Sequence, residues 1–482
     1  MQYKNTVLTN TTVAAFMAFL DSNIVVISLP TIVRELPGTT AFDAVWLIMG
    51  YSLVSATVLL TLGRLGDIFG RVKLYNAGFA VFTIGSGLCS ISWNGGVLVL
   101  FRMIQGLGGA MIFANNNAIL TDAFPIEERG RAIGTNQVVG IAGSVIALVA
   151  GGILTSTLGW RSIFWINLPV GTFATLWAYA KLHEVKTVSK ESIDYVGNLL
   201  FAPGLGLVLF SSTIGALQGF GLQYVSLLVL GLLLIAGFVY IELHVAHPMV
   251  DMRLFRIREF ASGAAANLLN SIARGGLSLV LVIYLQGALF LSALQSGLDL
   301  VPFSLAFVSS GPLSGFLSDK YGSRPFVTAG IVIGSAALLW FALLPAGAPY
   351  TEIVAPMILA GFGGGVFAAP NLASIMNAVP SARRGVASGM SSLLFNVGLL
   401  LSITMSFIIM AVSIPRTYLE LIFAGLPAPS GLNLQLFGRA MHETFIAMAV
   451  VNAFAVVPVL VRWTSKRTLP EKTIGANVAV EH

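Results

Sequence analysis

The chain carries very little charge. Only 10% of its 482 residues are Asp, Glu, Lys or Arg, whereas 56% are hydrophobic, and the mean hydropathy is +0.88. A soluble protein carries about 25% charged residues, so this chain cannot cover a water-facing surface with polar groups. The composition excludes a soluble globular protein and predicts an all-α membrane protein that crosses the bilayer many times.

Several chemical signatures are also missing. The single cysteine, Cys89, lies in an apolar run and cannot form an internal disulfide. No Gly-Lys dipeptide occurs, which excludes a phosphate-binding loop, and neither G-x-S-x-G nor H-E-x-x-H is present. His244 and His247 have no cysteine partners to complete a metal site. We therefore expect no enzyme activity, no cofactor and no metal. In a membrane protein the net charge of +6 is interpreted by its location, and no nucleic-acid partner is expected.

Apolar runs long enough to span a bilayer recur along the chain. A spanning helix needs about 20 mostly apolar residues. The first run holds an aspartate and lacks a cleavage site, so we expect a retained helix and no signal peptide. Fourteen candidate spans lie near 10–32, 45–62, 74–92, 96–118, 132–155, 163–181, 195–214, 223–242, 262–286, 299–317, 326–345, 353–373, 385–412 and 441–462.

The distribution of Lys and Arg predicts the orientation. With both termini placed in the cytoplasm, twenty of the 26 basic residues fall in cytoplasmic segments, four in external segments and two within spans. Cytoplasmic loops are the ones enriched in Lys and Arg. We therefore expect a multi-pass protein of the plasma membrane with both termini cytoplasmic.

A charged, glycine-rich turn occurs twice. The sequence GRLGDIFGRVKLY at 63–75 is followed 252 positions later by GFLSDKYGSRP at 315–325, and PIEERGRAIG at 125–134 pairs with PSARRGVASG at 380–389. The repeat predicts two homologous six-helix halves with two extra helices between them, and a substrate site between the halves near the bilayer midplane. The predicted divisions are 1–181 (first half), 182–258 (two additional spans and their loops), 259–465 (second half, with an external segment at 413–440) and 466–482 (cytoplasmic tail).

Four motifs in order give the chain a family resemblance. LDSNIVVISLP at 20–30, GRLGDIFGR at 63–71, RMIQGLGGA at 102–110 and WRSIFWINLPVG at 160–171 resemble the motifs of the fourteen-span drug:proton antiporters of the major facilitator superfamily. The resemblance implies proton-coupled export of drugs, as in antibiotic resistance, by alternation of two six-helix halves. One motif departs from the family pattern, because Ala147-Leu148 stands where a Gly-Pro pair usually precedes Gly151-Gly152. The small residues Gly143, Ala147 and Gly151 still recur every four positions and permit close helix packing.

Two charges inside the spans are candidates for proton coupling. Asp21 lies about midway through the first span, where an ionised carboxylate costs about 2.5–3.5 kcal/mol. Desolvation favours the neutral acid, so this carboxyl is suited to load and release a proton. Arg102, in the fourth span, can reach the depth of Asp21, and we predict contact between them, directly or through water. A static polar contact or a permanent structural ion pair is the alternative.

The repeated turn is a candidate cytoplasmic gate. We predict that Asp67 meets a helix N-terminus and acts with Arg71, while Gly63 and Gly70 let neighbouring backbones approach. The second copy keeps glycines and an acid but has Ser323 in place of the arginine, which predicts a weaker latch. Gly63, Asp67 and Gly70 of the first copy correspond to Gly315, Asp319 and Gly322 of the second. Charges that only set the topology are the alternative.

The second half has its own polar residues in apolar spans. Arg274 is central in the ninth span, and no acid lies nearby in that span. Two hypotheses follow. In the first, Arg274 faces the cavity and contacts an anionic or carbonyl-bearing substrate; in the second, it pairs with a backbone carbonyl or extends its side chain to the membrane surface. Asn270, one turn earlier, and Asn396 are further cavity candidates.

Taken together, these features predict a monomeric transporter in the lipid bilayer that uses protons to export amphipathic small molecules or drugs. An uptake symporter or uniporter of the same fold is the alternative, and a membrane sensor that does not transport is a more distant one.

Overall fold

Long apolar helices make up most of the structure, as the scarcity of charge predicts. The computed structural model describes residues 3–184, 194–245, 248–380, 383–426 and 432–461, and within these ranges every regular element is helical. The first seven helices are α1 (Tyr3–Glu35), α2 (Ala41–Phe69), α3 (Arg71–Ser90), α4 (Gly95–Ala123), α5 (Ile126–Leu158), α6 (Ser162–Trp165) and α7 (Asn167–Lys181). They are followed by α8 (Tyr195–Gln218) and α9 (Leu222–His244).

The remaining helices include several interrupted ones. They are the 3₁₀ helix η1 (Met252–Arg256), α10 (Arg258–Arg274), α11 (Leu277–Ile283), the π-helix η2 (Tyr284–Ala288), α12 (Ala293–Asp299), α13 (Val301–Tyr321), α14 (Ser323–Leu343), α15 (Tyr350–Asn377), α16 (Arg384–Ser413), α17 (Arg416–Phe423), α18 (Leu432–Phe454) and α19 (Val456–Val461). Four predicted spans are thus built from consecutive pieces: α6 with α7, α10 with α11 and η2, α12 with α13, and α18 with α19.

Thirteen helical segments of the described chain are long and apolar enough to cross a membrane. The predicted span near 74–92 is present as α3 but is not one of the thirteen. Polar residues in its first turns, among them Arg71, Lys73 and Asn76, lower its hydropathy. The structure therefore shows a multi-span helical membrane protein, and the count of fourteen stays a prediction.

The helices extend beyond the apolar runs, because a helix continues through polar turns outside the hydrocarbon layer. The largest difference is at the last span, which was predicted to begin at 441, whereas α18 begins at Leu432. The predicted external segment at 413–440 is therefore shorter, and it contains the helix α17. Residues 427–431, most of the 182–194 loop and the tail at 466–482 lie outside the described residues.

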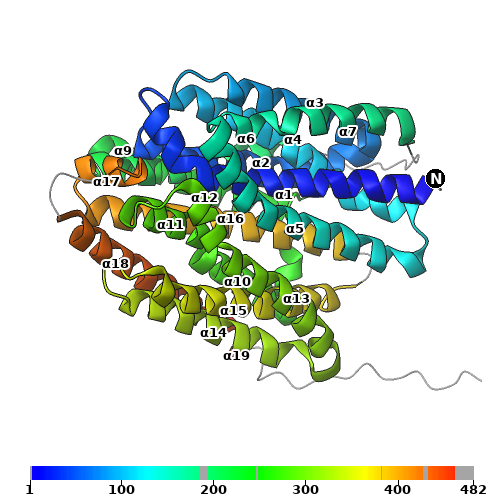
Figure 1. Ribbon diagram of the computed structural model, residues 1–482. Helices are drawn as coiled ribbons and strands as arrows, with labels where there is room; N and C mark the ends of the chain where they lie inside the picture. The colour runs from blue at the N-terminus through cyan, green and yellow to red at the C-terminus, as the bar shows by residue number, and fades with distance from the viewer. Residues whose placement is uncertain (1–2, 185–193, 246–247, 381–382, 427–431, 462–482) are drawn as a thin grey trace, which may run out of the picture.

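Contacts group the helices into two bundles. Helices α1 to α7 pack mainly on one another, and α10, α13 to α16, α18 and α19 form a second group (Figure 1). Helix α12, which leads into α13 of the second group, packs chiefly against α5 of the first. The pair α8 and α9 packs together, and α8 lies against α2 of the first bundle and α16 of the second. Residues 63–75 and 315–325 lie at one end of the molecule, the motif face, and α17 lies at the other end, the α17 face.

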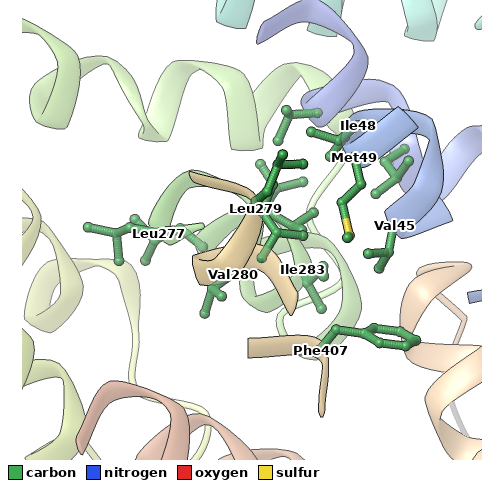
Figure 2. Packing of buried hydrophobic residues seen from close by; sticks show 14 of the residues in the cluster. Val45, Ile48, Met49, Leu277, Leu279, Val280, Ile283 and Phe407 are labelled. Carbon is green, nitrogen blue, oxygen red and sulfur yellow. The ribbon is translucent and has the colours of Figure 1, made fainter. Parts of the chain in front are cut away.

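An apolar seam joins the two bundles. Figure 2 shows Val45, Ile48 and Met49 of α2 beside Leu279 and Ile283 of α11, with Phe407 of α16 close by; these side chains belong to one buried cluster. Burying an aliphatic or aromatic side chain of this size contributes about 1.5–3 kcal/mol. Opening the seam to water would therefore cost several such contributions, which makes it a stable barrier.

Candidate functional site

The carboxylate of Asp21 is the centre of a buried polar network. Its side chain is 0% exposed, and Arg102 Nη1 donates to Oδ2 at 2.7 Å. Gln105 Nε2 and Asn167 Nδ2 both donate to Oδ1 at 2.8 Å. A buried charge is tolerated when a counter-ion and hydrogen bonds satisfy it. Here α1, α4 and α7 each supply part of that arrangement.

The guanidinium of Arg102 is held as tightly as its partner. Arg102 is 1% exposed, its Nη1 also donates to Gln105 Oε1 at 2.6 Å, and its Nε donates to the Leu47 carbonyl at 3.4 Å. The ring of Tyr51 lies 4.5 Å from the guanidinium carbon, a cation–π contact. The predicted contact between Asp21 and Arg102 is therefore direct in this conformation.

Two members of the network were missed by the sequence reasoning. Gln105 lies in RMIQGLGGA and Asn167 in WRSIFWINLPVG, the motifs that carried the resemblance. The available signal was an amide side chain within an apolar span, since such a group must find a partner. Asn167 also donates to Ser86 Oγ at 3.1 Å, which ties the network to α3.

At the motif face, Arg71 joins two acids. Its Nε donates to Asp67 Oδ1 at 2.6 Å and its Nη1 to Asp122 Oδ2 at 2.7 Å. Asp67 ends α2 and Asp122 ends α4, so the arginine at the start of α3 links three helices of the first bundle. Asp122 was not predicted, because only the fold brings the end of α4 to this turn.

The anion at the N-terminus of α3 is Glu184 rather than Asp67, which corrects the prediction. The carboxylate of Glu184 accepts from Val72 N at 3.3 Å and from Lys73 N at 3.2 Å. Asp67 lies in the last turn of α2, the wrong end of a helix for a favourable dipole contact. Gly70, with φ of +112°, makes the turn between the helices, and a Cβ there would lie 2.8 Å from the Glu184 carboxylate.

The predicted roles of the other glycines change as well. Nothing lies within 4 Å of a Cβ placed on Gly63, so this glycine does not permit a close approach here. Gly66 does so instead, because a Cβ there would collide with the side-chain oxygen of Asn115 on α4. In the second copy, Gly322 has φ of +85° and makes the matching turn, and Gly315 is in ordinary contact with Ala369. Asp319 is exposed and forms no ion pair within the described ranges.

The small residues of α5 pack against both bundles. Cβ atoms on Gly143 and Gly151 would lie 2.8 Å from Phe16 O and 2.5 Å from Ile27 Cγ2 on α1, and Ala147 is 0% exposed. Gly152 faces the second bundle, where its Cβ would lie 2.6 Å from Leu294 Cα.

A glycine of α12 likewise lets the backbone of α5 approach closely. A Cβ on Gly297 of α12 would collide with the carbonyl oxygen of Leu148 on α5. The backbone of Leu148 therefore lies directly in the contact between α5 and α12.

Two hydrogen bonds join the bundles near the α17 face. Gln286, in the π-helix η2, donates through Nε2 to the Ile27 carbonyl at 2.8 Å and is buried. Glu420 of α17 accepts from Ala41 N, at the start of α2, at 2.6 Å. Short π-helical turns are frequent at functional positions. The bundles are thus held together at this end by apolar packing, glycine contacts and polar bonds.

Of the cavity candidates of the second bundle, Arg274 and Asn270 lie near each other, because Arg274 and Asn452, the partner of Asn270, both approach Gly334, whereas Asn396 lies apart. Arg274 Nη2 donates to the Ala360 carbonyl, the backbone pairing that the sequence left open, and its guanidinium lies against Gly364 of α15. Asn270 is 8% exposed and donates to Asn452 Oδ1 at 2.8 Å, toward α18. Asn396 donates to Ser392 O on its own helix at 2.8 Å.

No group of three His, Cys, Asp or Glu side chains suited to a metal ion occurs in the parts of the chain that the structure describes. His244 Nδ1 lies 2.7 Å from the Tyr240 carbonyl, and His247 is outside the described residues.

Two membrane-spanning bundles that meet along an apolar seam, with a buried ion pair in one of them, define a helical membrane transporter. Residues 11–245 and 263–478 match the model of the Major Facilitator Superfamily. The chain belongs to this superfamily, and its relatives are transporters and not enzymes.

Named relatives include transporters with different cargo. The riboflavin transporter RibZ of Clostridioides difficile is 33% identical over 387 residues, covering 80% of this chain and 83% of that protein. The multidrug resistance protein B homolog of Mycobacterium tuberculosis is 34% identical and covers 68% of this chain and 61% of that protein. The multidrug resistance protein Stp of the same species is 31% identical over 78% of this chain and 70% of that protein.

Solved structures share the fold at low sequence identity. An auto-inhibited peptide transporter of the POT family gives a TM-score of 0.68 at 17% identity, covering 98% of this chain and 99% of that chain. A bacterial homolog of the human lysosomal transporter Spinster, in an inward-facing and unoccupied conformation, gives 0.68 at 16% identity, covering 95% and 96%.

Proposed function

We propose that the chain is a proton-coupled secondary active transporter that exports amphipathic small molecules or drugs by alternating access. The observation that carries the proposal is the ion pair of Asp21 and Arg102, which is fully desolvated inside the first bundle. Buried charges of this kind mark transport pathways and proton relays in membrane proteins. Relatives named for multidrug resistance support the cargo.

The coupling would work by exchange of partners on Asp21. In this conformation the carboxylate is satisfied by Arg102, Gln105 and Asn167. A rearrangement of α1 against α4 and α7 would remove these donors, and a proton would then replace the lost positive charge. Restoring the ion pair would release the proton, so that each cycle would carry protons against the movement of substrate.

Alternation requires the bundles to separate at one end and close at the other. The α17 face is tightly packed through Gly152 and Gly297. At the motif face, nothing lies within 4 Å of Cβ positions on Gly63, Gly134 and Gly385. These open positions would receive the opposite bundle when the motif face closes, with Asp67, Arg71 and Asp122 as the latch of the first bundle.

The finer architecture belongs to the same proposal. We assign α3 as a fourteenth span, both termini to the cytoplasm of a plasma-membrane protein, and a monomeric state. The halves are 1–181 and 259–465, with 182–258 as the two additional spans. Arg274 forms no ion pair among the described residues, so a cavity reached by Arg274, Asn270 or Asn396 would favour anionic or carbonyl-bearing substrates.

An uptake symporter or uniporter is the second candidate. The relative named as a riboflavin transporter favours it, because that cargo is a specific solute, and Leu148 in place of the helix-five proline favours it too. A sensor without transport is a third and more remote candidate.

Transport by purified protein in liposomes separates these functions. Cationic, neutral and anionic amphipathic compounds, with riboflavin among them, are screened for movement driven by an imposed pH gradient. Substrate movement against the proton flow supports export, movement with it supports symport, and counterflow without a pH effect supports a uniporter. Asp21→Asn should keep counterflow and lose accumulation driven by the gradient, whereas Glu35→Gln, an exposed change on the same helix, should retain both. Undiminished accumulation by Asp21→Asn would overturn the role given to Asp21.

A further inference from the structure

A pair of buried acids lies outside the Asp21 network, where α8 and α9, the two central helices, approach the motif face. Asp194 caps the N-terminus of α8 and is 8% exposed, and Glu242 lies in the last turn of α9 and is 3% exposed. A Cβ on Gly197 would lie 2.6 Å from Asp194 Oδ2 and 2.9 Å from Glu242 Oε1. The two carboxyl groups therefore share one small space that only a glycine leaves free.

Three of the four carboxyl oxygens have a backbone donor. Gly197 N donates to Asp194 Oδ1 at 2.7 Å, Met249 N to Glu242 Oε1 at 3.1 Å, and Val250 N to Glu242 Oε2 at 2.9 Å. Asp194 Oδ2 is buried and has no hydrogen-bond partner within the described part of the chain. Two carboxylates that face each other in a buried space cannot both remain ionised.

A single proton resolves both problems. Placed between Asp194 Oδ2 and the carboxyl group of Glu242, it supplies an O–H hydrogen bond that joins the two groups and removes one of the two negative charges. The proton then belongs to the pair rather than to either residue. We propose that Asp194 and Glu242 share one proton and form a second protonation site, which fastens the 248–257 segment to the central helices.

The 248–257 segment connects this site to both bundles. The Pro248 carbonyl accepts a hydrogen bond from Arg64, which lies in the repeated turn of the first bundle. Asp251 forms an ion pair of 3.0 Å with Arg383, at the start of α16 in the second bundle. Glu242 holds the segment between these contacts through its bonds to Met249 and Val250. Loss of the shared proton would place two charges beneath the segment and loosen it.

Neither of the two acids, Asp194 and Glu242, has a basic side chain as an ion-pair partner in the part of the chain that the structure describes. The elements packed here also carry other ionisable groups: Asp43, Tyr51, Arg64 and Asp67 on α2, Tyr195 on α8, Tyr224, Tyr240 and His244 on α9, Asp251, Arg253 and Arg256 in the 248–257 segment, Arg258 and Glu259 on α10, and Arg383 and Arg384 at the start of α16. The inference deepens the proposed function, since a pH-dependent link between the bundles would regulate alternation, but the protonation itself does not require transport.

Infrared spectroscopy of the full chain in lipid nanodiscs tests the shared proton. The wild-type protein should show a carboxylic-acid carbonyl band that is lost as the pH is raised. Asp194→Asn should lack this band yet fold, because the amide N–H can donate to Glu242 in place of the shared proton. Glu35→Gln, an exposed acid on α1, should retain it. A band unchanged in Asp194→Asn would overturn the proposal.

A spin label at Arg253, which is exposed, reports on the segment itself. Its mobility should rise with pH in the wild type and stay constant in Asp194→Asn, and a label at the exposed Lys320 should not change in either. The same pH response in Asp194→Asn would overturn the proposal. Mobility that follows sodium concentration at constant pH would also overturn it, since the pair would then bind a cation. Neither measurement uses transport, so a failed transport assay would leave this result unaffected.

Discussion

At the scale of residues, the buried pair of Asp21 and Arg102 has consequences for stability that differ from its role in coupling. Each charge is tolerated only because the other is present, together with Gln105 and Asn167. Removing one partner of a buried pair costs about 3–5 kcal/mol, whereas replacing both is often neutral. The energetics of the pair can therefore be separated from transport by measuring unfolding.

We predict that Arg102→Met lowers the thermal unfolding midpoint in detergent strongly, since it leaves a buried carboxylate without its counter-ion. The double variant Asp21→Asn/Arg102→Met should recover most of the loss. Arg439→Met, which breaks an ion pair whose arginine side chain is 74% exposed, should change the midpoint little, because such pairs contribute about 0–1 kcal/mol. Intrinsic tryptophan fluorescence measures all three. A double variant as unstable as Arg102→Met would contradict this account.

The environment of Glu420 predicts that α17, which we call the lid, docks on the start of α2 in a pH-dependent way. Burial raises the pKa of Glu420, and the hydrogen bond from Ala41 N opposes this shift. A carboxyl with a raised pKa binds its proton more tightly when α17 is docked than when α17 is released. Docking is therefore favoured at low pH and weakens as the pH rises from about 4.3, the value of a free glutamate, through the raised pKa.

A fluorophore at the exposed Thr417 of α17 tests this dependence. Its emission should report release of α17 as the pH rises, and Glu420→Gln should abolish the change while keeping an acceptor for Ala41 N. The charged neighbours of Glu420 are Arg416 and Asp43, and neutralising Arg416 serves as the control for their influence. A pH response that persists in Glu420→Gln would show that another group controls the lid.

At the scale of elements, the contact between α5 and α12 decides whether the α17 face can close. Gly297 and Gly152 each let a backbone of the opposite bundle approach, and backbone atoms cannot rotate out of the way. Overpacking of such a contact costs about 1–3 kcal/mol. A single methyl group is therefore enough to shift the equilibrium between the closed and open α17 face.

We predict that Gly297→Ala favours separation of the bundles at the α17 face. Spin labels at the exposed Thr157 and Thr351 should give longer distances in this variant than in the wild type. Gly311→Ala is the matched control, because nothing lies within 4 Å of its Cβ position. Unchanged distances in Gly297→Ala would mean that the helices slide past the added methyl group without opening.

At the scale of the whole molecule, the position of α3 determines the number of spans. If α3 crosses the bilayer, Lys73 and Trp93, which are both exposed, lie on opposite sides of the membrane. We predict that an impermeant maleimide labels Trp93→Cys in intact cells and labels Lys73→Cys only after lysis. Cys89 is buried and should remain unlabelled. Labelling of both positions from the same side would exclude α3 as a span.

The sequence determined the properties that depend on composition and local pattern. Scarce charge required a membrane protein, the turn at 63–75 and its copy at 315–325 indicated two related halves, and Asp21 and Arg102 stood out because charges are costly inside spans. The glycines of α5 predicted close helix packing, but the sequence did not indicate which helices they would contact.

The tertiary structure alone decided which side chains meet. Helical periodicity tells which residues share a face, but not which face of which helix lies opposite. Gln105 and Asn167 converge on Asp21, Glu184 takes the helix terminus expected for Asp67, and Asn270 turns toward α18. Each of these pairings joins residues far apart in the chain, and their contact follows from the packing of whole helices.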